Sequence, residues 1–305
     1  MVRRKVCDIM SNAIRGIALN NSVRILAINS TEIIKNVQKQ LGTTPCASAA
    51  LGRTLSITAL IGLMQKNEDR VLIQINGNGP LGKIHTQYLG NGKVRGYVDN
   101  PNVEIIINKQ NKLGVKEVVG IEGTLDVTIM QGLKNDYHGS VPLVSGEISE
   151  DFTYYFAISE QIPSVVSAGV LVDTDTTISS SGAIIIQLLP NADEDDIQYV
   201  ESCVEKVSDL SRKLLEHNDI NKFINDIFPD FELLEEKEIV YECLCSFEDM
   251  QSKISTLSID DLEEIKNEDH GIEAVCPWCN SKYWFDEIKL DEIIKYKKDN
   301  SLKKQ

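Results

Sequence analysis

The sequence predicts an α+β protein with three parts, and three observations support this. Between residues 70 and 130, apolar and polar residues alternate with a period of two and glycine turns separate the runs, a pattern typical of antiparallel sheet. After Pro190 the composition becomes strongly acidic, and four of the seven cysteines then gather between positions 243 and 279. We therefore expect an N-terminal mixed α/β core domain (1–190), an acidic helical linker (191–238) and a small C-terminal four-cysteine zinc domain (239–305).

The core domain is expected to begin with a strand and two helices. The strand covers 23–28, and a helix follows from Thr31, a residue type that caps helices, as far as Leu41. Pro45 opens a second helix that extends to Met64 and is rich in small residues, so another element can approach its backbone closely. Further strands are expected at 71–75, 83–88, 93–98, 118–130, 165–172 and 182–189, with a turn at 139–142 and a helix over 149–161.

Some features of the core domain resemble functional motifs but have simpler explanations. Residues 77–82 match the glycine pattern of dinucleotide-binding loops, which requires a helix N-terminus facing the phosphates. Pro80 lies inside this loop and a strand is expected after it, so we interpret the loop as a turn between strands. Cys46 is interpreted as a small core residue rather than a nucleophile, because free cysteine is among the most buried residue types. His85 and His138 have no second ligand type nearby in sequence.

The linker combines high negative charge with an apolar stripe. Residues 191–242 contain sixteen Asp or Glu and five Lys or Arg. Apolar residues recur every three or four positions, which predicts one amphipathic helix, and a shorter helix is expected at 223–228. A solvated connector is one interpretation, but the stripe argues that the helix docks. We expect it to cover the apolar sheet of the core domain; packing within the linker or on the zinc domain is the alternative. The stripe consists of Ile197, Val200, Val204, Val207, Leu210 and Leu214.

The C-terminal cysteines form two close pairs with the spacing of a metal site. Cys243 and Cys245 form a C-x-C pair, and thirty residues separate them from the C-x-x-C pair Cys276 and Cys279. Four thiolates suit tetrahedral Zn²⁺, and such a closed site leaves no open position for catalysis. A purely structural zinc ribbon is one interpretation. Adjacent thiolates can also close into local disulfides, which would make the site an oxidation sensor.

The predicted zinc domain is small enough to depend on its metal. Helices are expected at 247–257 and from 258 to 271, strands at 272–275 and 283–285, and a final helix after them. A domain of about 60 residues has a marginal core. A structural zinc contributes roughly 10–16 kcal/mol, whereas a whole domain is stable by only about 5–15 kcal/mol. Loss of the metal is therefore expected to unfold this domain.

Composition excludes several other kinds of function. The formal net charge of −15 argues against nucleic-acid binding, which needs a basic face. There is no uninterrupted run of about 18 apolar residues, so no membrane span is expected, and the basic N-terminus lacks the apolar run of a secretory signal. The odd cysteine count and metal-type spacing fit a reducing cytoplasm. We find no triad, activated nucleophile or phosphate cradle, so we expect no enzyme and no catalytic residues; Cys7, Cys46 and Cys203 should be dispensable.

Over essentially its whole length the chain resembles the 33 kDa chaperonin (heat-shock protein 33) family of redox-regulated holdase chaperones. The cysteine array is the most specific part of the resemblance, and five other regions identify the body. They are Asn78-Gly-Pro-Leu-Gly82, Val94-Arg-Gly-Tyr-Val98, Tyr137-His-Gly-Ser-Val-Pro-Leu-Val-Ser-Gly-Glu147, Ser159-Glu-Gln-Ile-Pro-Ser164 and Gln187-Leu-Leu-Pro190.

The resemblance implies a cytosolic, ATP-independent chaperone that binds unfolding proteins under oxidative stress. It implies zinc on Cys243, Cys245, Cys276 and Cys279 in the reduced, inactive state. On oxidation it implies Cys243–Cys245 and Cys276–Cys279 disulfides, zinc release, unfolding of the C-terminal part and active homodimers. The alternative is a zinc-ribbon module that binds protein or nucleic acid with a purely structural zinc.

The chain departs from the family pattern in two places. After the C-x-C pair it reads Ser246-Phe-Glu-Asp-Met, where the family often has Ser-Arg-Glu-Arg. It reads Ser180-Ser-Gly-Ala where the family often has Ala-Gly-Gly. The first departure removes arginines that could stabilise thiolates, so the oxidation threshold is the property that we expect it to change.

Overall fold

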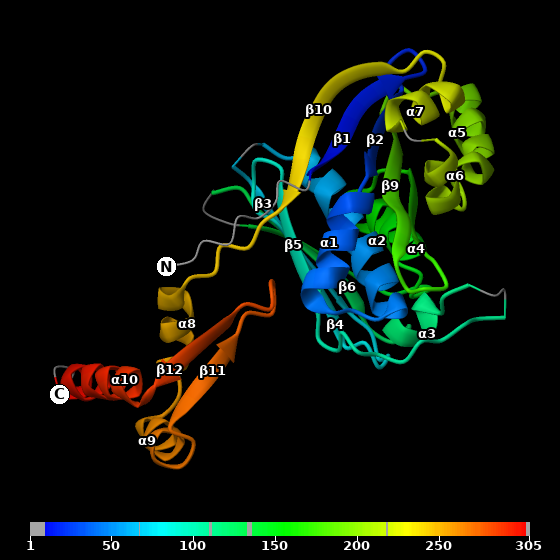
Figure 1. The fold of residues 1–305 in the computed structure, drawn as a ribbon. Helices are drawn as coiled ribbons and strands as arrows, with labels where there is room; N and C mark the ends of the chain where they lie inside the picture. Colours follow the sequence, from blue (N-terminus) through cyan, green and yellow to red (C-terminus); the bar gives the residue numbers. More distant parts are fainter. Residues whose placement is uncertain (1–9, 67, 110–111, 133–135, 218, 303–305) are drawn as a thin grey trace. The chain divides into compact units, whose positions relative to one another are not determined.

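The computed structural model describes residues 10–66, 68–109, 112–132, 136–217 and 219–302. The chain divides into two compact units, Met1–Glu242 and Cys243–Gln305, and each is described by itself. Residues 191–242, which include the predicted linker, belong to the first unit. The fold class is as predicted: an α+β body with a large, mainly antiparallel sheet, followed by a small unit that carries the four cysteines (Figure 1).

The first unit is built on a ten-stranded sheet in the order β7-β6-β3-β4-β5-β10-β1-β2-β9-β8. All neighbours are antiparallel except β5 and β10, which pair in parallel through Lys93–Val240 and Val94–Tyr241. β10 thereby joins two antiparallel halves into one sheet. The strands are β1 Met10–Ala18, β2 Val23–Asn29, β3 Arg70–Asn76, β4 Lys83–Tyr88, β5 Lys93–Val98, β6 Thr124–Met130, β7 Tyr137–Pro142, β8 Ser164–Val172, β9 Ile178–Leu188 and β10 Glu232–Tyr241.

The central helix of the first unit is α2 (Pro45–Leu63), which is buried along almost its whole length. Pro45 starts it at a position where the missing N–H leaves no hydrogen bond unmade. Its small residues permit close contact: a Cβ on Gly62 would lie 2.2 Å from the ring of Tyr88. By length and composition α2 could cross a membrane. However, 94% of its apolar stretch is buried within the protein, as in a core helix.

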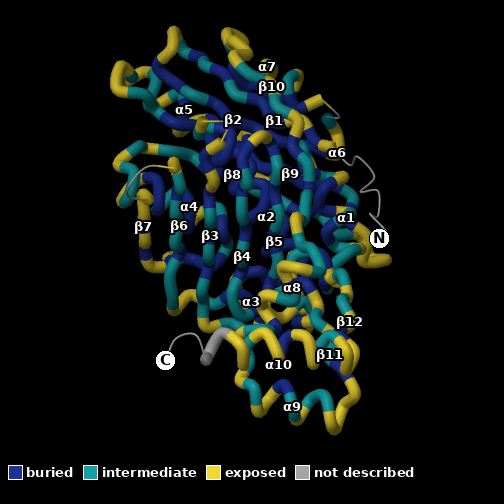
Figure 2. The backbone as a smooth tube through the Cα atoms, turned by 90° about the vertical axis from the view of Figure 1, so that its left-hand side faces the viewer, coloured by how far each residue is buried: buried dark blue, intermediate teal, exposed yellow. Residues whose placement is uncertain are grey.

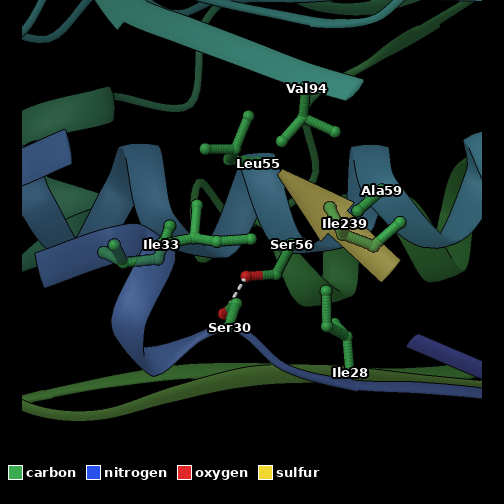
Figure 3. A pocket seen from close by; sticks show the side chains of 9 residues that line it. Ile28, Ser30, Ile33, Leu55, Ser56, Ala59, Val94 and Ile239 are labelled. Carbon is green, nitrogen blue, oxygen red and sulfur yellow. Dashed lines mark hydrogen bonds between the residues drawn. The ribbon is translucent and has the colours of Figure 1, made fainter. Parts of the chain in front are cut away.

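Shorter helices complete the core around α2. They are α1 (Thr31–Leu41), α3 (Val115–Val119) and α4 (Ser149–Tyr155), which continues into the π-helical turn η1 (Phe156–Glu160). Figure 3 shows part of this core, where Ser30 and Ser56 hydrogen-bond at 2.7 Å among aliphatic side chains. The side chains fill this space so closely that it has no room for a water molecule, so it is core and not a ligand site.

The acidic segment packs on the sheet, and this confirms the expected docking of its apolar stripe. It forms α5 (Glu194–Val207), α6 (Leu210–Glu216) and α7 (Ile220–Ile227), which lie beside β1, β2 and β9 (Figure 1). Four stripe residues, Val200, Val207, Leu210 and Leu214, are buried against apolar residues of those strands, among them Ile14, Ile25 and Ile184. Gly182 permits this contact, because a Cβ there would lie 2.3 Å from Leu214.

The prediction of one continuous helix over the stripe was wrong. The chain breaks at Ser208 and Asp209, and Asp209 adopts φ of 49°, a left-handed conformation that ends α5 and redirects the chain into α6. Ile197 is only partly buried and Val204 is 47% exposed, so neither belongs to the buried cluster on the sheet. After this break Leu210 and Leu214 are buried in the same apolar cluster on the sheet as Val200.

Several other expected elements need correction. The strand expected over 118–130 is α3 followed by β6, and the turn expected at 139–142 is the end of strand β7. Gly139 is there for packing: a Cβ would lie 2.4 Å from the Ser159 hydroxyl and 3.0 Å from Tyr155. The helix expected over 149–161 changes to a π-helical turn after Tyr155. β1 and β10 were not predicted.

The second unit is a β-hairpin with three helices. It contains α8 (Phe247–Ile254), α9 (Ile259–Glu268), β11 (Gly271–Val275), β12 (Lys282–Asp286) and α10 (Glu287–Leu302), and β11 pairs antiparallel with β12. Its core is small. Two of the nine buried residues in it are cysteines, Cys276 and Cys279. Much more of the second unit's backbone than of the first unit's sheet is coloured as exposed or intermediate (Figure 2).

Candidate metal centre

The four predicted cysteines meet at one place in the second unit. The sulfur atoms of Cys243, Cys245, Cys276 and Cys279 all lie within 4.8 Å of one another. The first pair lies on the extended segment between β10 and α8, and the second pair lies in the turn between β11 and β12. Two distant stretches of sequence therefore supply two sulfurs each, as the spacing predicted.

The hairpin turn aims the second pair. The Cys276 amide donates to the Ser281 carbonyl at 2.9 Å, and the amides of Cys279 and Asn280 donate to the Cys276 carbonyl at 3.4 and 2.8 Å. Asn280 adopts φ of 56°, a left-handed conformation that asparagine tolerates better than most residues. This tight turn brings both sulfurs to the same side of the hairpin.

The C-x-C spacing suits the extended backbone of the first pair. In an extended chain residues i and i+2 point to the same side, so Cys243 and Cys245 can share a face while Leu244, 54% exposed, points elsewhere. Ser246 then ends the segment by capping α8: its hydroxyl accepts from the Asp249 amide at 3.0 Å, and the Asp249 carboxylate accepts from the Ser246 amide at 3.0 Å.

The sulfurs interact with one another and with two hydroxyl groups. Sγ of Cys245 lies 3.3 Å from Sγ of Cys279, and Sγ of Cys243 lies 3.7 Å from Sγ of Cys276. The Tyr283 hydroxyl lies 3.1 Å from Sγ of Cys245, and the Ser281 hydroxyl lies 3.2 Å from Sγ of Cys279. The cysteine spacing did not reveal these hydroxyl contacts, although Ser281 and Tyr283 follow the C-x-x-C pair closely in sequence.

Because the sulfur atoms lie so close together, the pKa values of the Cys243 and Cys279 thiols differ from one another. Hydrogen bonds with Cys276 and Cys279, with burial as a further cause, raise the pKa of Cys243 far above its usual value. Hydrogen bonds from Cys243 and Cys276 lower the pKa of Cys279. Four adjacent thiolates repel one another unless a cation lies among them. The donor set and its partial burial therefore fit one thiophilic metal ion held by all four sulfurs.

The other described cysteines, Cys46 and Cys203, belong to the first unit. Cys46 is fully buried in the core around α2, and Cys203 is fully buried where α5 packs on the sheet. Burial raises the pKa of both thiols, which keeps them protonated and unreactive. Cys7 lies outside the described residues.

The remaining candidate motifs of the first unit also have structural explanations. The glycine loop 77–82 connects β3 to β4, and a Cβ on Gly77 or Gly79 would lie 2.1 or 2.2 Å from a backbone oxygen of α3. Its glycines thus allow α3 to pack against the loop. His85 stacks on Tyr97 with ring centroids 4.7 Å apart, and His138 contacts the Thr128 hydroxyl at 3.0 Å.

The fold and the site together define a class of protein. Its members have an α+β body followed by a small unit in which four clustered cysteines form a candidate metal-binding site. A family model described as "Hsp33 protein" matches residues 11–286, so the chain belongs to the Hsp33 family of chaperones. The resemblance found in the sequence is confirmed.

Individual relatives agree with this assignment along most of their length. The "33 kDa chaperonin" of Oceanobacillus iheyensis is 40% identical over 92% of this chain and 98% of its own, and that of Shouchella clausii is 41% identical over 92% and 96%. The crystal structure of the 33 kDa chaperonin (heat shock protein 33 homolog) from Thermotoga maritima superposes with a TM-score of 0.87 at 33% identity, covering 96% of this chain and 99% of that one.

Proposed function

We propose that this chaperone is an ATP-independent holdase controlled by oxidation, and that it is inactive while its four-cysteine centre is reduced and zinc-bound. The observation that carries the proposal is the sulfur cluster itself: all four thiols lie within 4.8 Å inside a unit with a small core. Chemistry at these sulfurs can therefore decide whether the unit stays folded.

Cys243, Cys245, Cys276 and Cys279 would hold one Zn²⁺ in a tetrahedron, and the metal would supply the cross-link that fixes both cysteine segments. Oxidation removes the negative charge that binds a cation. A thiolate attacks hydrogen peroxide, which breaks the O–O bond, forms a sulfenic acid and releases hydroxide. The partner thiolate then displaces a second hydroxide from the sulfenic sulfur, so one disulfide forms for each peroxide consumed and solvent protons convert both hydroxides to water. A disulfide sulfur carries no charge, so the site loses its affinity for the metal.

We expect the disulfides Cys243–Cys245 and Cys276–Cys279, as the family resemblance implies. The sulfur–sulfur contacts of 3.3 and 3.7 Å instead join one cysteine of each pair. The two pairings have different consequences, because local disulfides release the first cysteine segment from the hairpin whereas crossed ones keep the two connected. Peptide mapping of the oxidised protein distinguishes them, and a crossed pairing would contradict the release step.

We propose that unfolding of the second unit affects the first unit through β10, the strand that directly precedes the first cysteine pair. Its last residue, Tyr241, lies two positions before Cys243, and α5, α6 and α7 precede it and cover one face of the sheet. We propose that release of these helices exposes this apolar face to unfolding client proteins. The excess of acidic residues over 191–242 favours release through mutual repulsion. In this view 1–190 is the core, 191–238 the releasable linker and 239–305 the redox switch.

The remaining parts of the proposal follow the family resemblance. The oxidised form would be a homodimer acting in the cytoplasm, with no nucleic acid, membrane or catalytic reaction involved. The net charge of −15 supports the exclusion of nucleic acid.

The decisive experiment follows zinc, free thiols and chaperone activity in one sample. The reduced protein should contain one zinc and should not suppress light scattering by a heat-denatured client. After peroxide it should have lost zinc and four thiols, and it should suppress scattering without ATP. Full suppression by the reduced, zinc-loaded protein would overturn the redox control.

A zinc-ribbon binding module with a permanent structural zinc is the second candidate. It is favoured by exposed apolar side chains on the hairpin, where Trp284 is 57% and Val275 43% exposed. Such a module would keep its zinc after mild peroxide and would bind its partner equally well before and after oxidation.

A further inference from the structure

Tyr283 places its hydroxyl group between two acceptor atoms of the same cysteine. The hydroxyl oxygen lies 3.1 Å from Sγ of Cys245 and donates to the carbonyl oxygen of Cys245 at 3.3 Å. Tyr283 lies on β12, opposite Ala274 of β11, whereas Cys245 lies on the segment that precedes α8. The contact therefore connects the hairpin that bears the second cysteine pair to the segment that bears the first.

Aromatic packing fixes the position of this hydroxyl. The Tyr283 ring meets the Phe247 ring edge-on, with centroids 6.4 Å apart, and the Phe247 ring stacks on Phe285 at 4.5 Å. Phe285 is fully buried in the core of the second unit. Phe247 is the first residue of α8 and Tyr283 lies on β12, so the packing itself joins the two cysteine segments. The phenol is thus held at Cys245 by contacts that do not involve sulfur.

The oxidation state of the Cys245 sulfur decides which acceptor the phenol uses. A thiolate has no proton, so in the contact with Cys245 the phenol must donate, and a hydrogen bond to a charged acceptor is roughly twice as strong as one to a neutral acceptor. A disulfide sulfur is neutral and accepts weakly, which leaves the carbonyl oxygen as the better partner. Both acceptors are already within reach, so the change requires only rotation of the O–H group.

We propose that Tyr283 is a positioning residue. Its hydroxyl group donates a hydrogen bond to the Cys245 thiolate in the reduced state and to the Cys245 carbonyl oxygen after oxidation. This rests on the proposed redox function and adds an element to it. Donation withdraws charge from the sulfur, so it lowers the nucleophilicity of Cys245 toward peroxide. It also orients the sulfur toward the other three, as outer hydrogen bonds do for metal ligands.

The second pair has a weaker counterpart in Ser281. Its hydroxyl lies 3.2 Å from Sγ of Cys279, and its backbone carbonyl accepts from the Cys276 amide at 2.9 Å. A serine hydroxyl is free to rotate, whereas the Tyr283 phenol is held by ring packing. In each pair, therefore, one cysteine sulfur lies beside a hydroxyl group. The inference predicts that removing the hydroxyl changes the reactivity of Cys245 more than that of Cys279.

The test replaces Tyr283 with phenylalanine, which keeps the ring and removes the hydroxyl. Zinc affinity, measured by chelator competition on the full-length reduced protein, should fall about tenfold to a hundredfold, the usual cost of losing an outer hydrogen bond. Peroxide-driven zinc release should become faster. Site-resolved alkylation should show a severalfold faster reaction at Cys245, while the rate at Cys243 changes less. Unchanged affinity and unchanged Cys245 reactivity would overturn the proposal.

Two further variants separate the hydrogen bond from general effects. Tyr296→Phe removes a hydroxyl from a side chain of α10 that is 68% exposed, and it should leave every rate unchanged. If Tyr283→Phe disturbs folding, 4-aminophenylalanine at position 283 restores a donor on the same ring. Recovery of slow Cys245 alkylation would support the proposal, and failure to recover in a folded hairpin would contradict it.

The outcome is distinguishable from failure of the proposed function. Wild-type protein that binds zinc but never gains chaperone activity on oxidation would overturn the redox proposal, whereas the Tyr283→Phe comparison of affinity and alkylation would still decide the role of the tyrosine. Conversely, a wild type that switches normally with a Tyr283→Phe variant that matches it would overturn this inference alone.

Discussion

The two units of the chain differ in what holds their cores together. The first unit buries large apolar clusters on both faces of a ten-stranded sheet, with α2 on one face and α5, α6 and α7 on the other. The second unit has one small cluster, and two of its nine buried residues are cysteines of the proposed metal site. Apolar burial alone can stabilise the first unit, whereas the second combines a marginal core with a cross-link that chemistry can remove. One chain can therefore combine a unit that stays folded with a unit whose folding depends on the state of its cysteines.

The largest expected effect is the response to metal removal. Chelator added under reducing conditions should unfold the second unit, because a structural zinc contributes roughly 10–16 kcal/mol and a domain of this size has less than that in reserve. Hydrogen exchange should show lost protection in β11, β12 and α8, with β3 still protected. The reducing agent separates metal loss from disulfide formation. Simultaneous loss of protection in β3 would mean that the two units unfold as one.

Features that depend on local sequence could be predicted, whereas features that depend on partners distant in sequence could not. The cysteine cluster was predictable because ligand type and spacing are local properties, and α2 and β4 follow from equally local patterns. β10 was missed: it carries four Glu and one Lys among its ten residues. Its place in the sheet comes from partners distant in sequence, including the ion pair of Arg15 with Glu235 at 2.7 Å and the hydrogen bond from Asn12 to Glu236 at 2.7 Å.

The finer features of the site were also beyond local patterns. The contact of Tyr283 with Cys245 depends on the register of β11 with β12 and on the packing of Phe247, neither of which is encoded by residue spacing. The break between α5 and α6 was missed for a similar reason. Apolar residues recur through it without interruption, whereas the strands on which Leu210 and Leu214 are buried are distant in sequence.

The next effect in size is the loss of one proposed ligand. Cys243→Ser should weaken zinc binding strongly, because a hydroxyl replaces a soft thiolate in the tetrahedron. Chelator competition measures the affinity, and the same substitution at Cys245, Cys276 or Cys279 should give a similar loss. Cys46→Ser and Cys203→Ser are the matched controls in the first unit and should leave zinc binding and the oxidative response intact. Full, tight zinc binding by Cys243→Ser would contradict the four-thiolate site.

A smaller effect is expected where the acidic helices meet the sheet. Changing Val207, Leu210 and Leu214 to serine should weaken docking by a few kcal/mol, since each buried aliphatic side chain contributes about 1.5–3 kcal/mol. The triple variant should suppress client aggregation while still reduced and zinc-loaded, and its linker should become sensitive to protease.

Exposed neighbours provide the control for this comparison. Val204 and Leu215 are 47% and 52% exposed, so Val204→Ser with Leu215→Ser makes the same chemical change without uncovering the sheet. This pair should remain inactive until oxidised. If the buried triple variant also remains inactive, with its linker still protected from protease, the helices do not gate client binding.

The smallest effect compares one helix cap in each unit. Ser258 caps α9 by accepting from the Asp261 amide at 3.0 Å, and Asp193 caps α5 by accepting from the Asp196 amide at 3.0 Å. Ser258→Ala and Asp193→Ala should each cost about 1 kcal/mol. The same loss should lower Tm by about 4–8 °C in a unit of about 60 residues but only about 2–4 °C in one above 150, because the entropy of unfolding grows with size. Calorimetry of the reduced, zinc-loaded protein measures both, and Asp193→Asn, which keeps the acceptor, controls for charge. Equal shifts from the two cap losses would show that the units melt in a single transition, contrary to the independence on which the proposed switch depends.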